Sequence, residues 1–320
     1  MNDLVGIAIV HYGDPEATRR CLEAIRRDPS EVPRRIVVVD NSGDFPAGLL
    51  EEGEERLTSA DNPGFGEGAN RGLRYLLDRE SPRWLLALNH DAEIDPGFLD
   101  GARRALERGG VGAAGGPIYS RRDKRALWYA GGSVNRLTGT VRQSTSPADA
   151  RSPRPVGFVP GTALALSAQA FEELAGFDGR FFLYNEDLDL CRRLVARGFE
   201  VFFEPSMGSR HRLGAATGSE DRSPLYLEHL SAGRFLPFKS KLYRAYLGLL
   251  HTPYVILRCG VLALRYRAGA GPRIAALLRG HRRALGTIWA DPPPVAPAPD
   301  GPPPDGPPPD GPRSPPERTS

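Results

Sequence analysis

The sequence predicts an α/β protein built around a mainly parallel central sheet with flanking helices. Three short apolar runs, Leu4–Val10, Arg35–Val39 and Trp84–Leu88, have the continuous hydrophobic character of parallel strands that are covered on both faces. Each run is followed by a stretch with helix signals, and this alternation is typical of right-handed βαβ units. With 320 residues, the chain is long enough to bury a sizeable core.

Capping residues indicate where the helices of the first half begin. Asp14 and Pro15 supply an N-cap and a first-turn proline, so we expect a helix from there to about Arg27. The pair Asp95-Pro96 begins another helix in the same way. The other elements expected in this half are a helix at Gly66–Leu77 and a strand at Val111–Gly115.

The second half of the α/β region is less regular. Residues 117–154 are rich in glycine, serine and arginine, which predicts a hairpin and flexible loops. The elements expected after them are a strand at Phe158–Leu166, helices at Ala168–Leu174 and Asp187–Arg197, and a strand at Glu200–Phe203.

Changes in composition divide the chain into three parts. Residues 1–222 form the α/β domain, and residues 223–291 are a basic, apolar and helical extension. In residues 292–320 the pentapeptide Pro-Pro-Pro-Asp-Gly occurs at 302–306 and again at 307–311. Such a Pro/Gly/Asp-rich tail cannot form a core, so we expect it to be disordered.

The helical extension has the composition of a membrane-associated segment. Between Leu225 and Ala290 there are eleven lysines and arginines but one acidic residue, Glu228. Residues 245–264 are mostly apolar and long enough to span a bilayer. Because Arg258 interrupts them and basic residues flank them, helices lying on an anionic membrane surface are the favoured interpretation. A solvated helical cap on the domain and a true membrane span are the alternatives.

The cysteines and the N-terminus favour a cytoplasmic protein. Cys21, Cys191 and Cys259 are far apart and show neither disulfide-framework nor zinc-site spacing. The first residues lack the basic region and cleavage site of a signal peptide. The formal net charge of +3 is close to neutral, so it neither favours nor excludes a polyanionic partner.

Two acidic residues are expected to share one crevice. Asp40 and Asp91 each follow a predicted strand, and ligands of parallel sheets bind outside the carboxyl ends of the strands. In the segment Asn89-His90-Asp91, the carboxylate has the chemistry to hold Mg²⁺ or Mn²⁺ together with diphosphate oxygens. The alternative is that Asp91 only caps a turn. His11, at the end of the first strand, either contacts a nucleotide base or fills the strand end.

A second acidic segment suggests a general base. Glu186 and Asp187 follow the aromatic stretch Phe181–Tyr184 and begin a helix. The helix dipole stabilises an ionised Asp187, whereas burial beside aromatic rings raises its pKa. A carboxylate under both influences can accept the proton of a hydroxyl group. The alternative is a capping arrangement that only begins the helix.

Two further features carry a functional and a structural interpretation. His211 is either a third metal ligand or a loop or core residue. The segment 62–70 matches a dinucleotide-binding fingerprint at Gly64, Gly66 and Ala69, but it does not join the first strand to the first helix. Its glycines more plausibly let the backbone approach a donor nucleotide or sugar closely, and a plain glycine-rich turn is the alternative.

With its motifs in this order, the chain resembles the family-2 inverting glycosyltransferases of the GT-A fold, especially their rhamnosyltransferase-like branch. The resemblance covers roughly residues 4–215 and rests on five motifs in order. They are Val37-Val-Val-Asp-Asn-Ser42, Asn62-Pro-Gly-Phe-Gly-x-Gly-x-Asn70, Leu88-Asn-His-Asp91, Gly161-Thr162 and Phe181-Phe-x-Tyr-x-Glu-Asp-x-Asp-Leu190. Each motif alone is weak evidence, and their combination is specific.

The resemblance implies roles for the motif residues. Asp187 corresponds to the catalytic base, and Glu186 supports it or contacts the acceptor. Asp91 corresponds to the last, metal-binding carboxylate of a DxD-type motif, and His211 to a late histidine that completes the metal site. Asn89 stands where a full DxD motif has its first aspartate. The residues expected to bind the donor nucleotide are His11, Asp40, Asn41, Gly64, Gly66, Asn70 and Asn89.

The resemblance also implies the reaction. A sugar, with rhamnose from dTDP-rhamnose as the favoured donor, would be transferred with inversion to a hydroxyl of a cell-surface glycan or lipid-linked acceptor. A divalent cation, Mg²⁺ or Mn²⁺, is the expected cofactor, and no nucleic acid is expected as a partner. The expected location is cytoplasmic, peripheral to the inner face of the membrane. An NAD-dependent Rossmann oxidoreductase and a catalytically silent glycan- or nucleotide-binding module are the alternatives.

Overall fold

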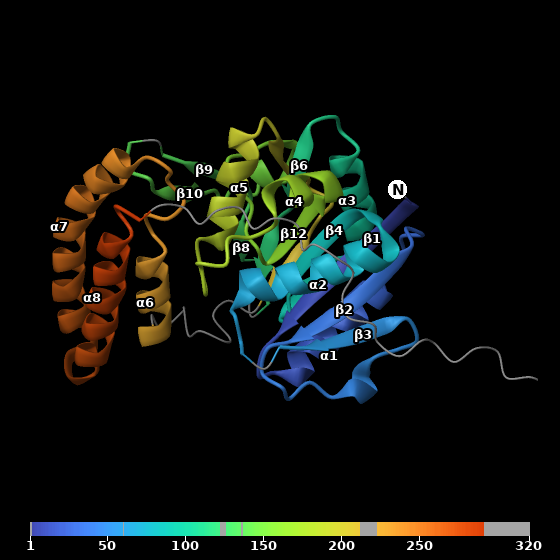
Figure 1. Ribbon diagram of the computed structural model, residues 1–320, viewed down its shortest axis with the longest axis horizontal. Helices are drawn as coiled ribbons and strands as arrows, with labels where there is room; N and C mark the ends of the chain where they lie inside the picture. Colours follow the sequence, from blue (N-terminus) through green and yellow to red (C-terminus); the bar gives the residue numbers. More distant parts are fainter. Residues whose placement is uncertain (1, 60, 122–125, 136, 212–222, 291–320) are drawn as a thin grey trace, which may run out of the picture.

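The computed structural model describes residues 2–59, 61–121, 126–135, 137–211 and 223–290. Its centre is an eight-stranded sheet in the order β11-β13-β6-β12-β4-β1-β2-β3 (Figure 1). The strands are β1 (Asn2–His11), β2 (Arg34–Asp40), β3 (Glu54–Thr58), β4 (Pro82–Asn89), β6 (Val111–Gly115), β11 (Arg154–Pro155), β12 (Ala163–Ser167) and β13 (Glu200–Phe203).

The sheet is mixed, although its first half is parallel as predicted. Strands β3, β2, β1 and β4 run parallel to one another, and β6 runs parallel to β13. Strand β12 lies antiparallel to both β4 and β6, and it begins at Ala163 instead of Phe158. The sequence pattern missed β3, because its side chains Glu54, Glu55 and Arg56 give an edge strand no apolar run.

Two helical layers cover the two faces of the sheet. Successive residues of a strand point to opposite faces. Accordingly, Ala8 and Val10 of β1 belong to one core cluster, and Ile7 and Ile9 belong to the other. Helices α2 (Phe65–Glu80), α4 (Ala168–Leu174) and α5 (Glu186–Ala196) pack in the first cluster, and α1 (Pro15–Arg26) and α3 (Phe98–Leu106) in the second. As predicted, Asp14 caps α1 by accepting a hydrogen bond from the Ala17 amide.

Short strands build the region for which the sequence predicted a hairpin and loops. A four-stranded sheet has the order β5-β14-β7-β8, and β9 pairs with β10 as an antiparallel hairpin. These strands are β5 (Ala92–Ile94), β7 (Ile118–Ser120), β8 (Leu127–Tyr129), β9 (Gly132–Val134), β10 (Val141–Gln143) and β14 (Ser209–His211). Three 3₁₀ turns occur at Ala47–Leu49, Asp149–Arg151 and Arg267–Gly269 among the described residues.

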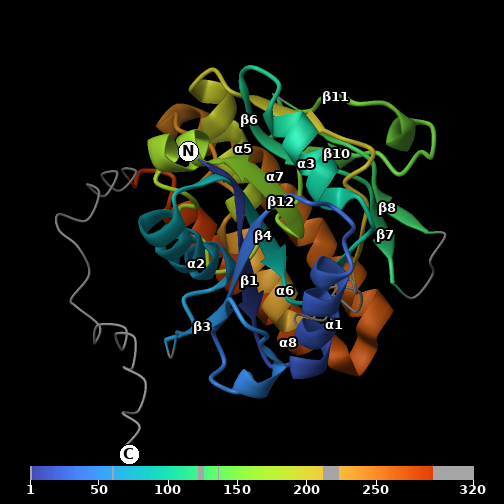
Figure 2. The ribbon, with the colours of Figure 1, turned by 90° about the vertical axis from the view of Figure 1, so that its right-hand side faces the viewer.

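The C-terminal helices form a separate layer at one end of the α/β domain (Figure 1), and they lie behind that domain in the view of Figure 2. They are α6 (Pro224–Ala232), α7 (Lys241–Tyr266) and α8 (Ala270–Gly286), and we call them the helical unit. Two small apolar clusters hold the unit together, one around Phe235 and Phe238 and the other around Leu227 and Leu262. The expected tail, 292–320, lies outside the described residues, as does the stretch 212–222 before the expected domain boundary.

Among the described residues, one helical region, Lys241–Gly286, is long and apolar enough to cross a membrane by length and composition alone. It comprises α7 and α8, with Pro253 inside α7. In Figure 1, α7 is the outermost helix, so one of its faces points away from the rest of the protein.

Candidate active site

The ends of the central parallel strands meet at one edge of the sheet. Strand pairing places His11 of β1 beside Asp40 of β2, and Val10 of β1 beside Asn89 of β4. Asp91 follows Asn89 by two residues and is buried. The register of three adjacent strands therefore places Asp40 and Asp91 at one edge of the sheet. That the two residues share one ligand crevice stays a prediction.

His11 and Asp40, two of the residues expected to bind the donor nucleotide, use their polar side-chain atoms in contacts with the protein itself. The His11 ring is fully buried, with Nδ1 2.6 Å from the Thr18 hydroxyl and Nε2 2.9 Å from Asp44 Oδ1. The Asp40 carboxylate accepts hydrogen bonds from the amides of Gly43 at 2.7 Å and Phe45 at 3.2 Å. Both side chains thus shape the loop after β2, and their contact with a donor nucleotide stays a prediction.

Asp91 and His211 come together although 120 positions separate them. Strand β14 pairs antiparallel with β5 and places His211 opposite Ala92, the neighbour of Asp91. His211 Nε2 lies 3.0 Å from Asp91 Oδ1. Burial by itself would raise the pKa of the Asp91 carboxyl, but the adjacent His211 ring and its hydrogen bond outweigh that effect and lower the pKa. The two side chains form a nearly buried pair.

This pair has the donor atoms of a divalent-metal site. His211 Nδ1 is buried and has no hydrogen-bond partner among the residues that the structure describes. A carboxylate oxygen and an imidazole nitrogen suit Mn²⁺, and oxygen donors also suit Mg²⁺. A second group, His11, Asp40 and Asp44, brings three possible ligand atoms within 4.8 Å of one another. In that group the protein already engages both His11 nitrogens and both Asp40 oxygens, so Asp91 and His211 fit a cation better.

The glycine-rich segment packs against the protein's own backbone. Gly64 has a φ of +90°, and a Cβ there would overlap the carbonyl oxygen of Phe182. The Phe65 amide donates to that same oxygen at 3.2 Å, and the side-chain amide of Asn41 donates to the carbonyl of Gly64 at 3.0 Å. A Cβ on Gly66 would lie 3.1 Å from Phe177 Cβ. Close protein packing therefore accounts for these glycines, and their approach to a donor stays a prediction.

Asn70 also has a structural role in the described chain. Its side chain makes two hydrogen bonds of 2.8 Å with Phe177, donating to the carbonyl and accepting from the amide. It also donates to Glu67 Oε2 at 3.0 Å. Asn70 thus attaches α2 to the segment that leads into α5.

The predicted base lies at the start of α5 with two hydrogen-bond donors directed at it. Asp187 Oδ2 accepts from the Gly161 amide at 2.9 Å, and Oδ1 accepts from the Leu188 amide at 2.8 Å. Gly161 lies just before β12. The motif Gly161-Thr162 was recognised in the sequence, but the hydrogen bond from its amide to Asp187 was not predicted. A Cβ on Gly161 would lie 2.9 Å from the Phe65 ring, so glycine lets the strand approach α2 and Asp187 closely.

Glu186 and Asp187 share one low-dielectric environment. Burial, with the charge of Asp187 as the second cause, raises the pKa of Glu186 to about 8. Burial also raises the pKa of Asp187, but the amides of Gly161 and Leu188 oppose this effect. Glu186 Oε2 is buried without a hydrogen-bond partner among the described residues. A pKa of about 8 leaves Glu186 mostly protonated near neutral pH, and the amides of Gly161 and Leu188 favour the charged form of Asp187 over that of Glu186.

The third acidic residue of this helix has a structural function. Asp189 is buried, and its carboxylate accepts a hydrogen bond of 2.5 Å from Arg193 Nε. Arg193 also donates to the carbonyls of Leu174 and Gly176. Asp189 therefore stabilises the start of the helix and its surroundings, as expected of an acidic residue with a structural role.

The family of the chain follows from a match over residues 84–280, which correspond to "Glycosyl transferase family group 2". The chain belongs to this family. The match spans more than half of the glycosyltransferase, including Asp91, Asp187, His211 and most of the helical unit. A glycosyl transfer function is thereby established in place of the oxidoreductase alternative.

Curated relatives agree with this assignment. The glycosyltransferase is 26% identical over 261 residues to an N-acetylglucosaminyl-diphospho-decaprenol L-rhamnosyltransferase of Mycobacterium tuberculosis, covering 74% of this chain and 85% of the relative. It is 27% identical over 203 residues to the low-salt glycan biosynthesis hexosyltransferase Agl10 of Haloferax volcanii, covering 60% of this chain and 62% of that protein. The resemblance to rhamnosyltransferase-like enzymes is confirmed.

Solved structures confirm the GT-A fold. The mannosyltransferase PcManGT of Pyrobaculum calidifontis, solved with GDP-Man and Mn²⁺, superposes with a TM-score of 0.55 at 18% identity over 88% of this chain and 80% of its own. GalNAc-T7, solved with UDP, GalNAc and Mn²⁺, gives a TM-score of 0.54 at 13% identity. That match covers 71% of this chain and about half, 47%, of GalNAc-T7.

Proposed function

We propose that this glycosyltransferase is a metal-dependent, inverting enzyme that transfers a sugar from a nucleoside-diphosphate donor to a hydroxyl group. The observation that carries the proposal is the Asp187 carboxylate, held by the amides of Gly161 and Leu188 beside the buried Glu186. A buried carboxylate that two amide donors position and stabilise in its charged form, beside a neighbour with a raised pKa, has the properties of a general base.

In this mechanism Asp187 takes the proton of the acceptor hydroxyl as the oxygen attacks the anomeric carbon. The bond to the diphosphate breaks in the same displacement, so the anomeric configuration inverts. A single base suffices, unlike the carboxylate pair of a glycosidase. Glu186, whose pKa of about 8 keeps it mostly protonated at neutral pH, is available to donate a hydrogen bond to the acceptor.

Asp91 and His211 are the residues that would hold the divalent cation, Mg²⁺ or Mn²⁺. When bound, the cation would neutralise charge on the leaving diphosphate. The 3.0 Å contact between His211 Nε2 and Asp91 Oδ1 supports this assignment, because it brings a nitrogen donor and an oxygen donor together. The Mn²⁺ in the solved structures of PcManGT and GalNAc-T7 is further support for a cation of this class.

The donor and acceptor follow by analogy with the curated relative. Its name specifies rhamnosyl transfer onto a diphospho-decaprenol lipid, so we propose dTDP-rhamnose or a similar donor and a lipid-linked or glycan acceptor. His11, Asp40, Asn41, Gly64, Gly66, Asn70 and Asn89 are the residues proposed for the donor side. Asn89, half-buried at the end of β4, stands closest in sequence to the proposed metal ligand.

A lipid-linked acceptor fits the outer face of α7, which we propose lies on the cytoplasmic surface of the membrane. Nine large apolar side chains of α7 are exposed, and several of them, such as Leu249 at 76% and Leu264 at 83%, are almost fully so. The others are Leu242, Tyr246, Leu250, Tyr254, Ile256, Leu257 and Val261. Exposed basic residues border this face, among them Lys239, Arg265 and Arg267. An apolar face with a basic border is typical of helices on anionic bilayers.

Sedimentation with vesicles tests the membrane surface. We expect the wild-type protein to sediment with phosphatidylglycerol-containing vesicles and to do so less with pure phosphatidylcholine. Leu249→Ser combined with Leu257→Ser should abolish sedimentation without lowering the melting temperature, because both side chains face solvent. Equal sedimentation of the double variant and the wild type would contradict this assignment of the face.

Thermal shift with sugar nucleotides tests the catalytic proposal. Nucleoside diphosphates and sugar nucleotides are added with and without Mn²⁺ to the wild type and to Asp91→Ala. A ligand at a hundred times its dissociation constant stabilises a protein by about 2.7 kcal/mol. We expect a Mn²⁺-dependent shift with one nucleotide, lost in Asp91→Ala, and transfer activity that is lost in Asp187→Ala. If Asp187→Ala retains full activity, Asp187 is not the base and the proposed mechanism fails. A wild-type protein that binds a sugar nucleotide but transfers no sugar would favour the silent-module alternative.

A further inference from the structure

The backbone directly before Asp187 is held in an unusual conformation. Tyr184 and Asn185 are consecutive non-glycine residues in the left-handed region, with φ of +66° and +70°. Residues other than glycine avoid this region, although asparagine tolerates it better than tyrosine does. Two such residues in succession persist only where surrounding contacts hold them. The contacts of residues 181–185, here called the base-leading segment, identify what holds them.

Asn185 occupies the N-cap position of α5 without capping it. An asparagine at an N-cap ordinarily accepts a hydrogen bond from the first turn of its own helix. In this protein the N-cap backbone is left-handed and its side chain makes no such bond. The side-chain amide donates instead to the carbonyl of Leu230 in α6, at 3.2 Å. The residue that begins the catalytic helix is thus attached to the helical unit.

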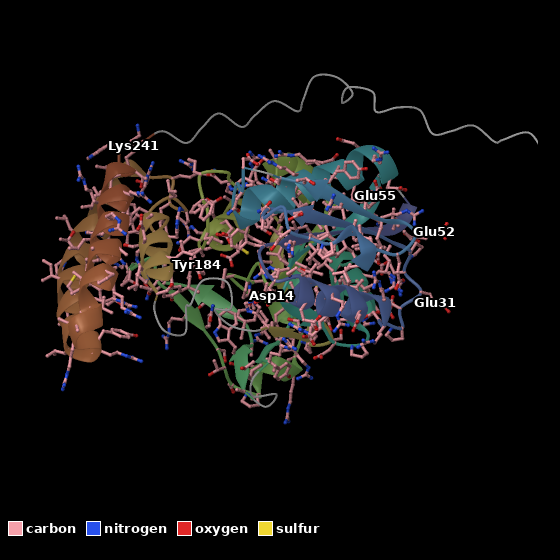
Figure 3. The ribbon with its side chains drawn as sticks, turned by 90° about the horizontal axis from the view of Figure 1, so that it is seen from below. Asp14, Glu31, Glu52, Glu55, Tyr184 and Lys241 are labelled. Atoms are coloured by element: carbon pink, nitrogen blue, oxygen red, sulfur yellow. The ribbon has the colours of Figure 1, made fainter. Side chains whose placement is uncertain are left out.

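Aromatic contacts join the same segment to α6. The Phe182 ring lies 4.8 Å from the His229 ring, and the Tyr184 ring meets Tyr226 edge-on at 5.2 Å. At the end of α6, a Cβ on Gly233 would lie 2.9 Å from the Phe181 ring, so the two chains approach closely there. Figure 3 shows Tyr184 on the side of the α/β domain that faces the helical unit.

The opposite side of the segment is fixed by the α/β domain. The carbonyl of Phe182 accepts a hydrogen bond from the Phe65 amide, and Gly64 packs directly against it. The segment is therefore held between α2 and α6, and it leads within two residues to the carboxylate that accepts from the Gly161 amide. A displacement on the α6 side would move Asp187 relative to the Gly161 amide, the donor that lies on a separate segment.

We propose that α6 positions the catalytic base: Asn185, through Leu230, and the ring contacts of Tyr226 and His229 hold the left-handed backbone that directs Asp187 toward the Gly161 amide. The helical unit is then a working part of the active site as well as a membrane-facing layer. This inference rests on the proposed role of Asp187. Asn185, Tyr226 and His229 are positioning residues in it, because they act through the backbone.

The test uses Asn185→Gly in the full-length protein. Glycine adopts the left-handed conformation without strain but cannot donate to Leu230, so the variant removes the contact and leaves the backbone feasible. His229→Leu weakens the same attachment from the α6 side. Ser81→Gly is the matched control, because Ser81 is a left-handed non-glycine residue (φ +48°) at the far end of α2. Circular dichroism and melting temperature establish that each variant is folded.

Activity is measured as Mn²⁺-dependent hydrolysis of the sugar nucleotide that stabilises the wild type, since water can replace an unidentified acceptor. We expect Asn185→Gly and His229→Leu to lower kcat at least tenfold with the donor KM within twofold of wild type, because misplacing a base by about 1 Å costs up to about a hundredfold. We also expect the acidic limb of the pH profile to move to higher pH, because Asp187 loses the Gly161 amide that stabilises its charge. Ser81→Gly should match the wild type.

The outcomes separate this inference from the proposed function. If Asp187→Asn abolishes hydrolysis but Asn185→Gly and His229→Leu retain the wild-type kcat and pH profile, the positioning role is wrong and the base assignment stands. If Asp187→Asn is as active as the wild type, both are wrong. A raised donor KM with an unchanged kcat would also overturn the inference, since it would show that the segment serves donor binding. If Asn185→Gly does not fold, the kcat and pH profile of His229→Leu decide whether α6 positions Asp187.

Discussion

Replacing Glu186 by glutamine tests the proton assignment of the Glu186–Asp187 pair through stability. Glutamine keeps the shape of the side chain but cannot ionise, so Glu186→Gln removes one buried titration. A carboxyl whose pKa is raised in the folded protein contributes stability that is present below its unfolded pKa and is lost as the pH rises through its folded pKa. For Glu186 that window extends from the ordinary value of 4.5 to about 8.

The size of the effect follows from these two pKa values. Each pH unit of difference between the folded and unfolded pKa corresponds to about 1.4 kcal/mol. Between pH 5 and pH 8, Glu186 therefore costs the wild type about 3 kcal/mol of unfolding free energy. The Glu186→Gln variant has no carboxyl at this position, so its unfolding free energy does not include this loss. We expect Glu186→Gln to be more stable than the wild type at pH 8 by roughly that amount, and nearly equal to it at pH 5.

Urea denaturation at pH 5, 6, 7 and 8, followed by circular dichroism, measures the free energies by linear extrapolation. Glu172→Gln is the matched control, because Glu172 is an exposed carboxyl on α4. It should follow the wild-type curve at every pH. Parallel curves for the wild type and Glu186→Gln would refute the inference that Glu186 holds a proton at neutral pH, and with it the division of roles between the two carboxyls.

Further predictions concern the base, the metal ligands and the glycine-rich segment. Asp187→Asn should lower kcat by about 10²–10⁴-fold while nucleotide-dependent stabilisation persists, as expected for loss of a general base; an unchanged kcat would contradict the assignment. His211→Ala should weaken the Mn²⁺-dependent thermal shift, as Asp91→Ala should, and retention of the full shift would remove His211 from the metal site. Gly64→Ala should lower the unfolding free energy by about 3 kcal/mol or more, because a Cβ overlaps the Phe182 carbonyl and φ is +90°. Urea midpoints comparable to wild type would show that the loop relaxes.

Much of the fold was accessible from local patterns. The strands β1, β2, β4, β6 and β13 were predicted because apolar runs reflect burial on both faces of a sheet, and α1 because Asp14 and Pro15 are strong local signals. The polar edge strand β3 and the three-residue strands β5, β7 and β14 were not predicted. Strands this short or this polar carry too little periodicity, and only their pairing partners define them.

The site divides in the same way. Asp91 and Asp187 could be selected from the sequence, because each follows a buried element and belongs to a motif. The hydrogen bonds of His11, Asp40 and Asn70 with the protein could not be foreseen. Their side chains have the same chemistry whether they contact a ligand or a neighbouring loop, and only the three-dimensional neighbourhood distinguishes the two.

The sequence by itself determined the α/β class, the strand ends that carry acidic residues, and the motifs of a family-2 glycosyltransferase, since these depend on residues close together in the chain. The tertiary structure decided which distant groups complete the site. His211 reaches Asp91 through the pairing of β14 with β5, and the Gly161 amide reaches Asp187 because β12 enters the sheet antiparallel. Asn185 meets Leu230 because α6 packs against the segment before α5. Such contacts are set by packing between separate elements, for which neighbouring residues carry no signal.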